Sequence, residues 1–363
     1  MNPSAGRLGL AVVAANYPSP ADPARGAFVA AFVREIGRME DVTVIAPDRI
    51  RPRLGRELGG GQQPGDVPAR VVRPRYPSFS DRVLLGGFST FRLTDWSFRR
   101  AAMRAARGLP RPDVVHGHFL FPAGAAALAL AERWRVPATV AVGESRPAYY
   151  ERHVGLERIR SLALRFAGLL CVSEQNRDYA VDRLGASTDR VLLVRNAADT
   201  TRFYPRGREE MRRKLGLPLD RPIAAFVGGF NASKGPLRVL EALRRRPDVC
   251  AVFLGSGPLA PAGDRVLFAG AVPHDSVPEW LSAADVFVLP TRAEGSSNAV
   301  AEAMACGLPI VTSDLPSMRA LVPGDAGLLV APDDVDALAG ALGTVLGDGG
   351  RRAAMAEAAL SRA

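Results

Sequence analysis

Two acidic residues with seven residues between them, Glu294 and Glu302, carry the strongest chemical signal in this 363-residue sequence. Carboxylates accept hydrogen bonds from hydroxyl groups and therefore suit the recognition of a sugar. Ser296 and Ser297 lie between them, and either serine can cap a following helix. The first backbone N–H groups of that helix then point into the space in front of the loop. Such helix ends attract phosphate. This short region thus offers N–H donors for an anion and carboxylates for hydroxyls, and a nucleotide sugar needs both.

The elements that must position these groups lie in residues 285–309. The apolar run Val286–Leu289 predicts a buried strand, and the alanine-rich run Asn298–Ala305 predicts a helix. Asn298 and Glu302 are one turn apart on that helix and so share one face. The alternative interpretation is that both glutamates are solvated charges of a loop and a helix.

A third chemical group, Lys234, follows a strand predicted at Pro222–Val227. Gly228 and Gly229 come directly after this strand, and Pro236 opens a helix. A strand, glycines and a helix with proline in its first turn form a layout that cradles phosphate. Lys234 is one of only two lysines among the 47 basic residues. A compact ammonium on a flexible stem suits a diphosphate oxygen.

The glutamate pair followed by the segment AMACGLPIV resembles the donor-site signature of retaining glycosyltransferases of the GT-B fold, family 4. The resemblance implies an α/β fold with two Rossmann-like, doubly wound parallel-sheet domains that face a central cleft. Residues 1–200 would form the acceptor-binding domain, and residues 201–363 the nucleotide-sugar-binding domain. A nucleoside-diphosphate sugar would be the donor substrate, and neither a cofactor nor a metal is expected.

The resemblance also implies roles for single residues. Glu302 would hold the ribose hydroxyls, and Glu294 would act at the transferred sugar as a catalytic residue. Lys234 and the N–H groups near Ser297 would stabilise the departing nucleoside diphosphate, which gains charge in the transition state. The predicted donor-binding residues are Gly228, Gly229, Lys234, Ser297, Asn298 and Glu302.

The sequence departs from the family pattern at two places. Gly229 stands where the family usually has an arginine, so the donor site lacks one positive charge unless Arg292 supplies it. Glu144 follows the strand predicted at Val136–Val142, where many family members have a histidine or an arginine. Weaker donor binding, a different donor or rescue by Arg292 would follow from the first difference. At the second, either Glu144 makes the contact instead or the contact is lost.

Loops of the first half are predicted to form the acceptor side, because ligands of parallel sheets bind outside the carboxyl ends of the strands. Asn16 and Gly26 bracket the loop after the strand predicted at Leu8–Ala14, and Glu144 follows a later strand. His118 lies in the segment HGHFLFPAG, which resembles a stretch in family members that act on lipid-linked or polymer acceptors. His118 is therefore a candidate catalytic residue, with a structural histidine as the alternative.

A metal site is not expected at His116 and His118, although two histidines at this spacing face the same side of a strand. No third ligand has a recognisable spacing from them.

The charge is divided unequally along the chain. Residues 1–200 contain 29 arginines and 19 acidic residues, whereas residues 201–363 contain 18 basic and 18 acidic residues. A basic first domain predicts an anionic contact, for which a membrane surface is a candidate; nucleic acid is not expected because no motif supports it. The run 97–107 would form a helix that either lies on such a membrane or is solvated. An arginine-rich solvated surface is the alternative interpretation of the whole excess.

These observations predict a retaining glycosyltransferase that moves a hexose-type sugar to a hydroxyl of a carbohydrate or lipid-linked acceptor, in the synthesis of cell-surface polysaccharide or glycolipid. The alternatives are a catalytically degenerate partner subunit and a sugar-nucleotide epimerase or hydrolase of similar fold. The sequence has no signal-peptide pattern and no apolar stretch of the ~20 residues that a membrane span needs. A cytoplasmic protein, peripheral at the inner face of the membrane, is therefore expected.

Overall fold

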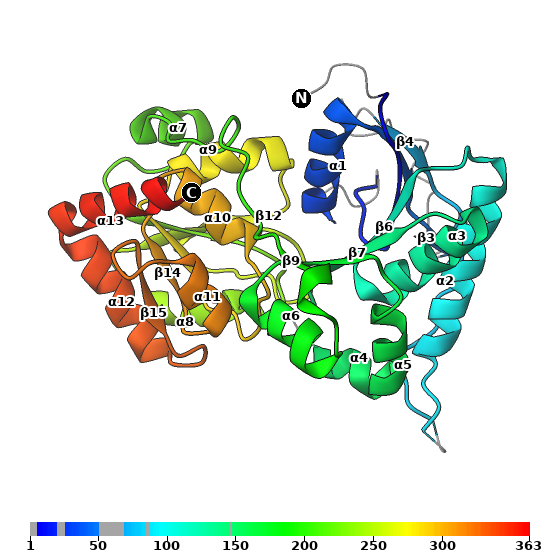
Figure 1. The fold of residues 1–363 in the computed structure, drawn as a ribbon. Helices are drawn as coiled ribbons and strands as arrows, with labels where there is room; N and C mark the ends of the chain where they lie inside the picture. Colours follow the sequence, from blue (N-terminus) through cyan, green and yellow to red (C-terminus); the bar gives the residue numbers. More distant parts are fainter. Residues whose placement is uncertain (1–5, 20–25, 51–68, 85–86, 145–146) are drawn as a thin grey trace. The chain divides into compact units, whose positions relative to one another are not determined.

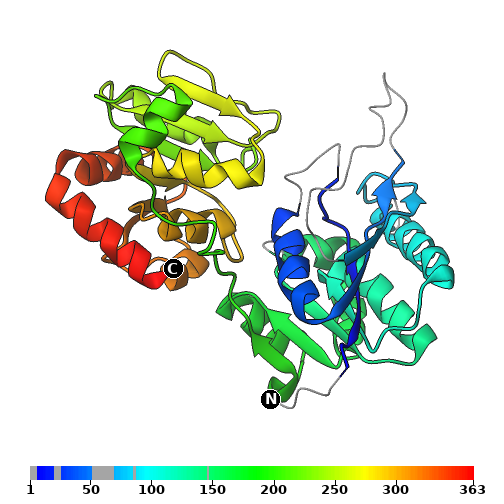
Figure 2. The ribbon, with the colours of Figure 1, turned by 90° about the horizontal axis from the view of Figure 1, so that it is seen from above.

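The computed structural model describes residues 6–19, 26–50, 69–84, 87–144 and 147–363. The chain forms two compact units, Met1–Val194 and Arg195–Ala363. Each unit is built on one large sheet of parallel strands with helices packed against it (Figures 1 and 2). This arrangement confirms the predicted pair of doubly wound α/β domains.

The first unit contains a seven-stranded sheet in the order β4-β2-β1-β6-β7-β8-β9. Its strands are β1 (Gly9–Ala14), β2 (Asp41–Ile45), β4 (Ala69–Val72), β6 (Val114–His118), β7 (Ala138–Val142), β8 (Gly168–Cys171) and β9 (Val191–Leu193), beside a short pair of β3 (Asp48–Arg49) and β5 (Arg75–Tyr76). Its α-helices are α1 (Ala27–Met39), α2 (Phe91–Ala105), α3 (Ala125–Trp134), α4 (Pro147–Val154), α5 (Leu156–Ala163) and α6 (Glu174–Asp178).

The sheet of the first unit buries apolar residues on both faces. Along β1, Ala11 and Val13 belong to one core cluster, which includes residues of α2 and α3. Val12 and Ala14 belong to the other, which includes residues of α1. Successive side chains of a strand point to opposite faces, so a continuous apolar run is what a sheet covered on both sides requires.

The second unit contains a six-stranded sheet in the order β12-β11-β10-β13-β14-β15. Its strands are β10 (Ile223–Val227), β11 (Cys250–Leu254), β12 (Val266–Gly270), β13 (Val286–Leu289), β14 (Ile310–Ser313) and β15 (Gly327–Val330). Its α-helices are α7 (Arg208–Leu215), α8 (Pro236–Arg244), α9 (Val277–Ser282), α10 (Asn298–Ala305), α11 (Pro316–Leu321), α12 (Val335–Gly347) and α13 (Gly349–Arg362). Later strands are added on one side of β10 up to β12 and on its other side from β13 onward, so the strand order reverses between β10 and β13. Ligands of such sheets bind at this position.

A buried ion pair holds α7 to the start of β13. Arg212 Nη2 lies 2.5 Å from Asp285 Oδ2, and both side chains are less than a tenth exposed. Arg212 also donates to the carbonyl oxygen of Ala283 at 2.9 Å, and Asp285 accepts the backbone N–H of Ile223 at 2.8 Å. The carboxylate therefore links β10 to β13 at their amino ends. The loops at the carboxyl ends of these strands thus extend from two strands that are held together.

The helix expected at residues 97–107 is part of α2, which begins earlier and packs into the core. Phe98, Ala101 and Ala102 have no solvent exposure. The core of the unit buries these apolar side chains, so they are not available to a membrane, and the exposed residues of the run include Arg100, Arg104 and Arg107. Within the part of the chain that the structure describes, no helix combines the length and apolar character of a bilayer-spanning segment.

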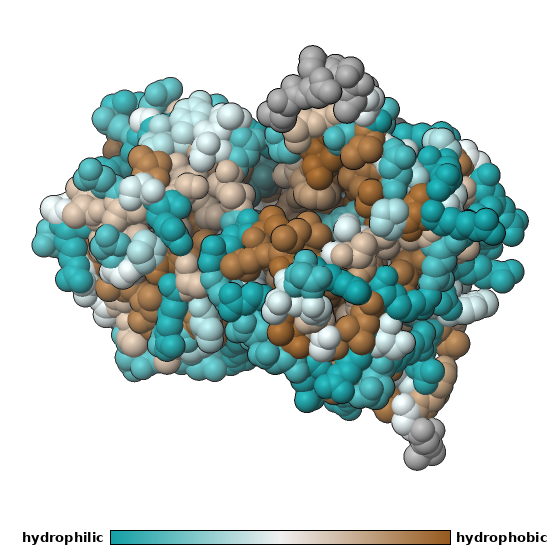
Figure 3. Space-filling model, in the orientation of Figure 1, coloured by the Kyte–Doolittle hydropathy of each residue, from teal (hydrophilic) through white to brown (hydrophobic). Residues whose placement is uncertain are grey.

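Apolar side chains remain exposed elsewhere in the first unit. Residues 79–84 and 87–90 lead into α2 and project from the unit, and the space-filling view shows hydrophobic residues in this region at the lower right (Figure 3).

Candidate functional site

The loop after β10 begins with Gly228 and Gly229 and lies backbone to backbone against the turn after β11. Gly228 donates its N–H to Leu254 at 2.9 Å, and a Cβ on Gly255 would come within 1.9 Å of the Gly228 carbonyl oxygen. Only glycine at 255 permits this approach. A Cβ on Gly229 would come within 2.9 Å of the amide nitrogen of Asn231, the far end of a movable side chain.

Lys234 and Glu294 form an ion pair, although 60 residues separate them in the sequence. The side chains are 28% and 13% exposed, so the pair is partly shielded from water. Lys234 is also held through its backbone N–H, which donates to Asn231 Oδ1 at 3.0 Å. The next residue, Gly235, has φ 76° and directly precedes α8, which begins at Pro236. Lys234 is therefore the second residue before α8, whose N-terminus favours an anion.

The loop after β13 is fixed on both sides of Glu294. Ser317 donates its hydroxyl to the Glu294 carbonyl oxygen at 2.7 Å, and Asn196 Nδ2 donates to the Ser296 carbonyl oxygen at 3.2 Å. Ser297 caps α10, since its Oγ accepts the N–H of Val300 at 3.4 Å. The prediction that one of the two serines caps this helix is confirmed.

Glu302 lies in α10, one turn after Asn298, and contacts a residue that the sequence analysis missed. Its Oε1 is 2.8 Å from Nε2 of His274, which follows β12. The imidazole in turn packs against Phe203, with ring centroids 5.3 Å apart. His274 could have been found by the same rule that selected Lys234 and Glu294, because it also follows the carboxyl end of a strand.

Arg292 lies in the same loop as Glu294. Its backbone N–H donates to Ser233 at 2.8 Å, and its guanidinium pairs with Asp333 at 2.8 Å. Arg238 lies nearby and donates to the Ala232 carbonyl oxygen at 2.9 Å. Burial and the charge of Arg292 lower the pKa of Arg238. The residues around Lys234 therefore include two further cations, whereas Gly229 supplies none.

In the second unit, the structure thus gathers the predicted residues on the loops after β10 and β13 and on the first turns of α10. Lys234 and Glu294 are in direct contact, and Glu302 is paired with His274 instead.

The predicted residues of the first unit follow β1, β6 and β7. A Cβ on Gly26, which has φ 67°, would come within 2.2 Å of the Asn16 carbonyl oxygen, so the two ends of their loop touch. His118, at the end of β6, packs its ring against those of Phe28 and Phe119 at 5.7 and 4.8 Å. The reversal of strand order between β1 and β6 places Asn16 and His118 at the sheet position where ligands bind.

Glu144 is buried and binds backbone groups. Its Oε1 accepts the N–H of Leu120 at 2.8 Å, and its Oε2 accepts the N–H of Gly143 at 3.1 Å. Burial raises its pKa to about 7, against the opposing effect of these N–H donors. Glu144 therefore joins the loop after β7 to the segment that follows His118.

His116 and His118 face the same side of β6, with ring centroids 5.5 Å apart. Burial lowers the pKa of His116 to about 3 and that of His118 to about 4, so both rings are neutral near pH 7. His116 Nδ1 lies 2.9 Å from Thr139 Oγ1. Among the residues with described positions, no group of three or more His, Cys, Asp or Glu side chains is arranged to hold a metal ion.

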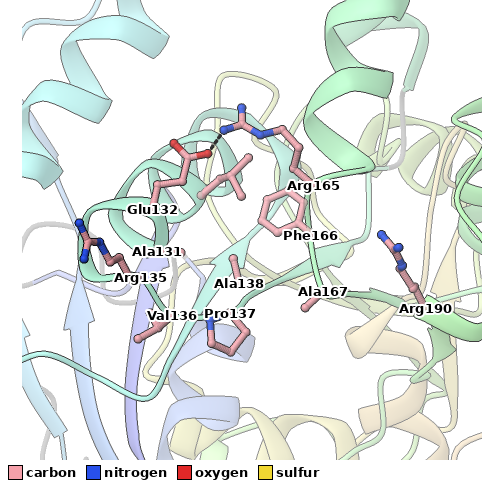
Figure 4. A pocket seen from close by; sticks show the side chains of 11 residues that line it. Ala131, Glu132, Arg135, Val136, Pro137, Ala138, Arg165, Phe166, Ala167 and Arg190 are labelled. Carbon is pink, nitrogen blue, oxygen red and sulfur yellow. Dashed lines mark ion pairs between the residues drawn. The ribbon is translucent and has the colours of Figure 1, made fainter.

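A pocket of about 540 Å³ lies at the opposite edge of the first unit's sheet (Figure 4). Val136 and Ala167 line it from the segments that enter β7 and β8. Arg165 pairs with Glu132 at its rim. Because this pocket lies at the amino ends of the strands, it contains none of the predicted site residues.

Comparison with known proteins gives consistent matches along the chain. Residues 26–202 match the family model described as Glycosyltransferase Family 4, and residues 221–348 match the model described as Glycosyl transferases group 1. TuaC of Bacillus subtilis, named as a teichuronic acid biosynthesis glycosyltransferase, is 29% identical over 342 residues, 90% of this chain and 86% of TuaC. A D-inositol 3-phosphate glycosyltransferase of Frankia alni is 30% identical over 288 residues, 69% of this chain and 70% of the relative.

Solved structures share the fold. A sucrose-phosphate synthase from Thermosynechococcus elongatus has a TM-score of 0.78 at 20% identity and covers 98% of this chain and 94% of its own. HepE of Anabaena, solved in complex with UDP-glucose, has a TM-score of 0.73 at 17% identity and covers 97% and 94%. The predicted GT-B fold is therefore confirmed.

Proposed function

Because this chain belongs to family 4 of the group 1 glycosyltransferases, we propose that it is a retaining enzyme that moves a hexose-type sugar from a nucleoside-diphosphate sugar to a hydroxyl acceptor. The observation that carries the proposal is the ion pair between Glu294 and Lys234, the second residue before α8. It brings a cation for the diphosphate next to a carboxylate for the sugar.

Lys234 can serve both partners at once, since an ammonium has three N–H donors. One would stay on Glu294 and another would bind a diphosphate oxygen. The leaving diphosphate gains negative charge as the glycosidic bond breaks, so a fixed cation stabilises the transition state more than the ground state. Glu294 would hold a hydroxyl of the transferred sugar, and Gly228, Gly229, Ser297 and Asn298 would frame the donor.

Glu302 is proposed to bind the ribose hydroxyls. A carboxylate has about four lone-pair sites, so it can accept from two hydroxyls while it keeps the contact with His274. HepE of Anabaena, solved with UDP-glucose, supports a nucleotide sugar as the donor class. Cofactor and metal chemistry is not part of the proposal, because Lys234 and the helix N-terminus provide the charge that the leaving group needs.

The acceptor is proposed to be a carbohydrate or a lipid-linked sugar used in cell-surface polysaccharide or glycolipid synthesis. The likeness to TuaC, named for teichuronic acid biosynthesis, supports this class. Asn16, Gly26 and Glu144 would lie on the acceptor side, and His118 would act near the reacting sugar. Retention at the anomeric carbon would follow from attack on the same face of the sugar that the diphosphate leaves.

A thermal-shift screen of UDP-, GDP- and ADP-hexoses would first identify a donor, and calorimetry would then measure its affinity for Glu302→Ala. We expect donor binding to be lost in this variant and kept in Glu357→Ala, which changes an exposed carboxylate of α13. Wild-type affinity in Glu302→Ala would overturn the assigned role.

Turnover assays with the identified donor would separate the proposal from its alternatives. Gly229 and Glu144 depart from the family pattern, and this favours a non-catalytic partner as the second candidate. Donor binding with no turnover on any carbohydrate or lipid-linked acceptor would support that candidate. Donor turnover in the absence of any acceptor would indicate an epimerase or a hydrolase.

A further inference from the structure

The described residues of the segment 79–96, which are 79–84 and 87–96, expose an unusual share of large apolar side chains. Of the sixteen such side chains that are exposed among the described residues, six lie in this segment. We call them the hairpin surface; its members are Phe79, Val83, Leu84, Phe88, Leu93 and Trp96. Leu84 and Trp96 are the most open, at 50% and 51% exposure. Single exposed apolar residues are ordinary on a protein, whereas a gathered set marks an interaction site.

The backbone under the hairpin surface is firmly held. Val83 and Ser89 form an antiparallel bridge, and Leu84 donates its N–H to Phe88 at 2.8 Å. Ser89 is buried and its Oγ lies 2.8 Å from Nδ1 of His153. Phe79 donates its N–H to the hydroxyl of Thr94 at 2.9 Å. These contacts fix the hairpin against α2, so the exposure of its apolar residues belongs to the folded state.

Helix α2 extends the hairpin surface with one exposed stripe. Arg92, Trp96 and Arg100 follow one another at intervals of four residues and therefore lie on the same face of the helix. All three are exposed, whereas Phe98 and Ala102 on the opposite face belong to the core. Arg104 continues the exposed stripe by another turn.

Arginines alternate with the apolar side chains. The guanidinium of Arg92 lies 5.6 Å from the ring centroid of Phe88, and that of Arg100 lies 5.7 Å from Trp96. Arg82 in the hairpin is also exposed. Of the two acidic residues of the segment, Asp81 is exposed and accepts the hydroxyl of Tyr149 at 3.0 Å, and Asp95 is buried beside Arg158. The exposed arginines outnumber the one exposed carboxylate, so the surface combines apolar groups with a net positive charge.

We propose that the hairpin surface docks the protein on a bilayer that contains anionic lipids. Leu84, Phe88 and Trp96 would enter the boundary between headgroups and acyl chains, and Arg92 and Arg100 would bind lipid phosphates. Tryptophan and arginine suit this boundary because each combines an apolar body with a polar or charged end. The inference is independent of the proposed transfer chemistry, because it requires neither a donor nor an acceptor.

A bilayer fits this surface better than a second copy of the chain. The segment projects from its unit rather than forming a groove, so few complementary protein shapes would cover it (Figure 1). A symmetric pair would also bring Arg82, Arg92 and Arg100 of one copy against the same arginines of the other, and like charges in contact oppose association.

Vesicle co-sedimentation of the full chain tests the proposal. Vesicles of phosphatidylcholine mixed with phosphatidylglycerol should bind the protein, and added salt or vesicles of phosphatidylcholine alone should weaken binding. Phe88→Ser with Trp96→Ser should reduce the partition constant by at least about tenfold, given the apolar area removed. Arg92→Gln with Arg100→Gln should reduce it by about 30-fold, since each basic residue near an anionic surface contributes about fivefold.

Matched controls change equally exposed residues of the other unit. Leu219→Ser with Leu360→Ser and Arg351→Gln with Arg362→Gln should leave vesicle binding unchanged. The emission of Trp96 should shift to the blue on mixed vesicles, and Trp96→Phe should remove this shift while the thermal midpoint stays unchanged. Equal losses in the controls, or no binding to the mixed vesicles at low salt, would overturn the proposal. Self-association that Trp96→Ser abolishes, without vesicle binding, would assign the surface to a second copy instead.

Discussion

The contact between His274 and Glu302 predicts how a residue outside the glutamate signature controls donor affinity. His274 Nε2 lies 2.8 Å from Glu302 Oε1, and the two side chains are 27% and 13% exposed. The ring of Phe203 also packs against the imidazole. We expect His274→Ala to leave Glu302 in place on α10 but without the partner that orients its carboxylate toward the ribose.

The size of the effect follows from this geometry. A hydrogen bond to a charged group contributes about 1.5–3 kcal/mol when it is well shielded. Because His274 is more than a quarter exposed, water can replace part of the contact. A loss of about 1 kcal/mol is therefore expected, which is about fivefold weaker donor binding. The change should raise Kd and KM and leave kcat nearly unaltered, since the ribose is remote from the bond that breaks.

Calorimetric titration with the donor identified by the thermal-shift screen measures this change. A double-mutant cycle with Glu302→Gln then tests whether the two residues act together. His274→Ala should weaken binding in the wild-type background and have little further effect in the Glu302→Gln background. Asp275→Ala alters the exposed neighbouring residue and should bind the donor normally. Unchanged affinity of His274→Ala, or fully additive losses in the cycle, would refute the reasoning.

Two further predictions concern stability. Arg212→Ala should lower the free energy of unfolding by about 1.5–3 kcal/mol, because it removes the buried one of the two arginines that pair with Asp285 and leaves only the half-exposed Arg208. Arg213→Ala on the exposed side of α7 should change it little, and chemical denaturation of both variants decides this. Glu144→Gln should remove a pH dependence of the free energy of unfolding. Burial raises the pKa of Glu144 from 4.5 to about 7 in the folded protein. The folded state therefore binds this proton more tightly than the unfolded state, and the stability that this provides is lost as pH rises from 4.5 to about 7. Over this range the free energy of unfolding of the wild type should fall by up to about 3 kcal/mol relative to that of E144Q. Calorimetry of both proteins from pH 5 to about 8 measures the difference between their free energies of unfolding, in which the contributions of His116 and His118 cancel. Parallel curves of stability against pH would contradict the prediction.

The frame of each domain could be predicted from the sequence because parallel strands covered on both faces are nearly continuous apolar runs. Ile223–Val227 and Val286–Leu289 are such runs, and both form central strands. A serine cap before the alanine-rich run was predictable as well, because serine is a preferred N-cap residue, although the sequence left Ser296 and Ser297 as alternatives. These signals are local, and the residues that carry them are neighbours in the chain.

Contacts between distant residues were harder to foresee. His274 is 28 residues from Glu302 and has no motif of its own, so only the folded sheet brings the two together. The run 97–107 shows the same limit. Its arginines predicted a helix with an exposed face, which α2 has, but the spacing did not reveal that Phe98 would be buried while Trp96, two residues earlier, would be exposed. Both residues belong to α2, and only the fold shows which face of that helix is buried.

The glycine at position 229, where the family usually has an arginine, shows that one motif position does not determine the charge of the whole donor site. A diphosphate responds to the total positive potential near it, and this potential does not depend on which strand supplies the cation. Arg292 is anchored through its backbone to Ser233, the residue before Lys234. Its guanidinium is about half exposed and shares Asp333 with Arg238, so one carboxylate offsets two cations. The excess charge beside Lys234 is therefore positive even with Gly229 in place, and Arg292 is the residue whose loss should reveal whether that excess is used.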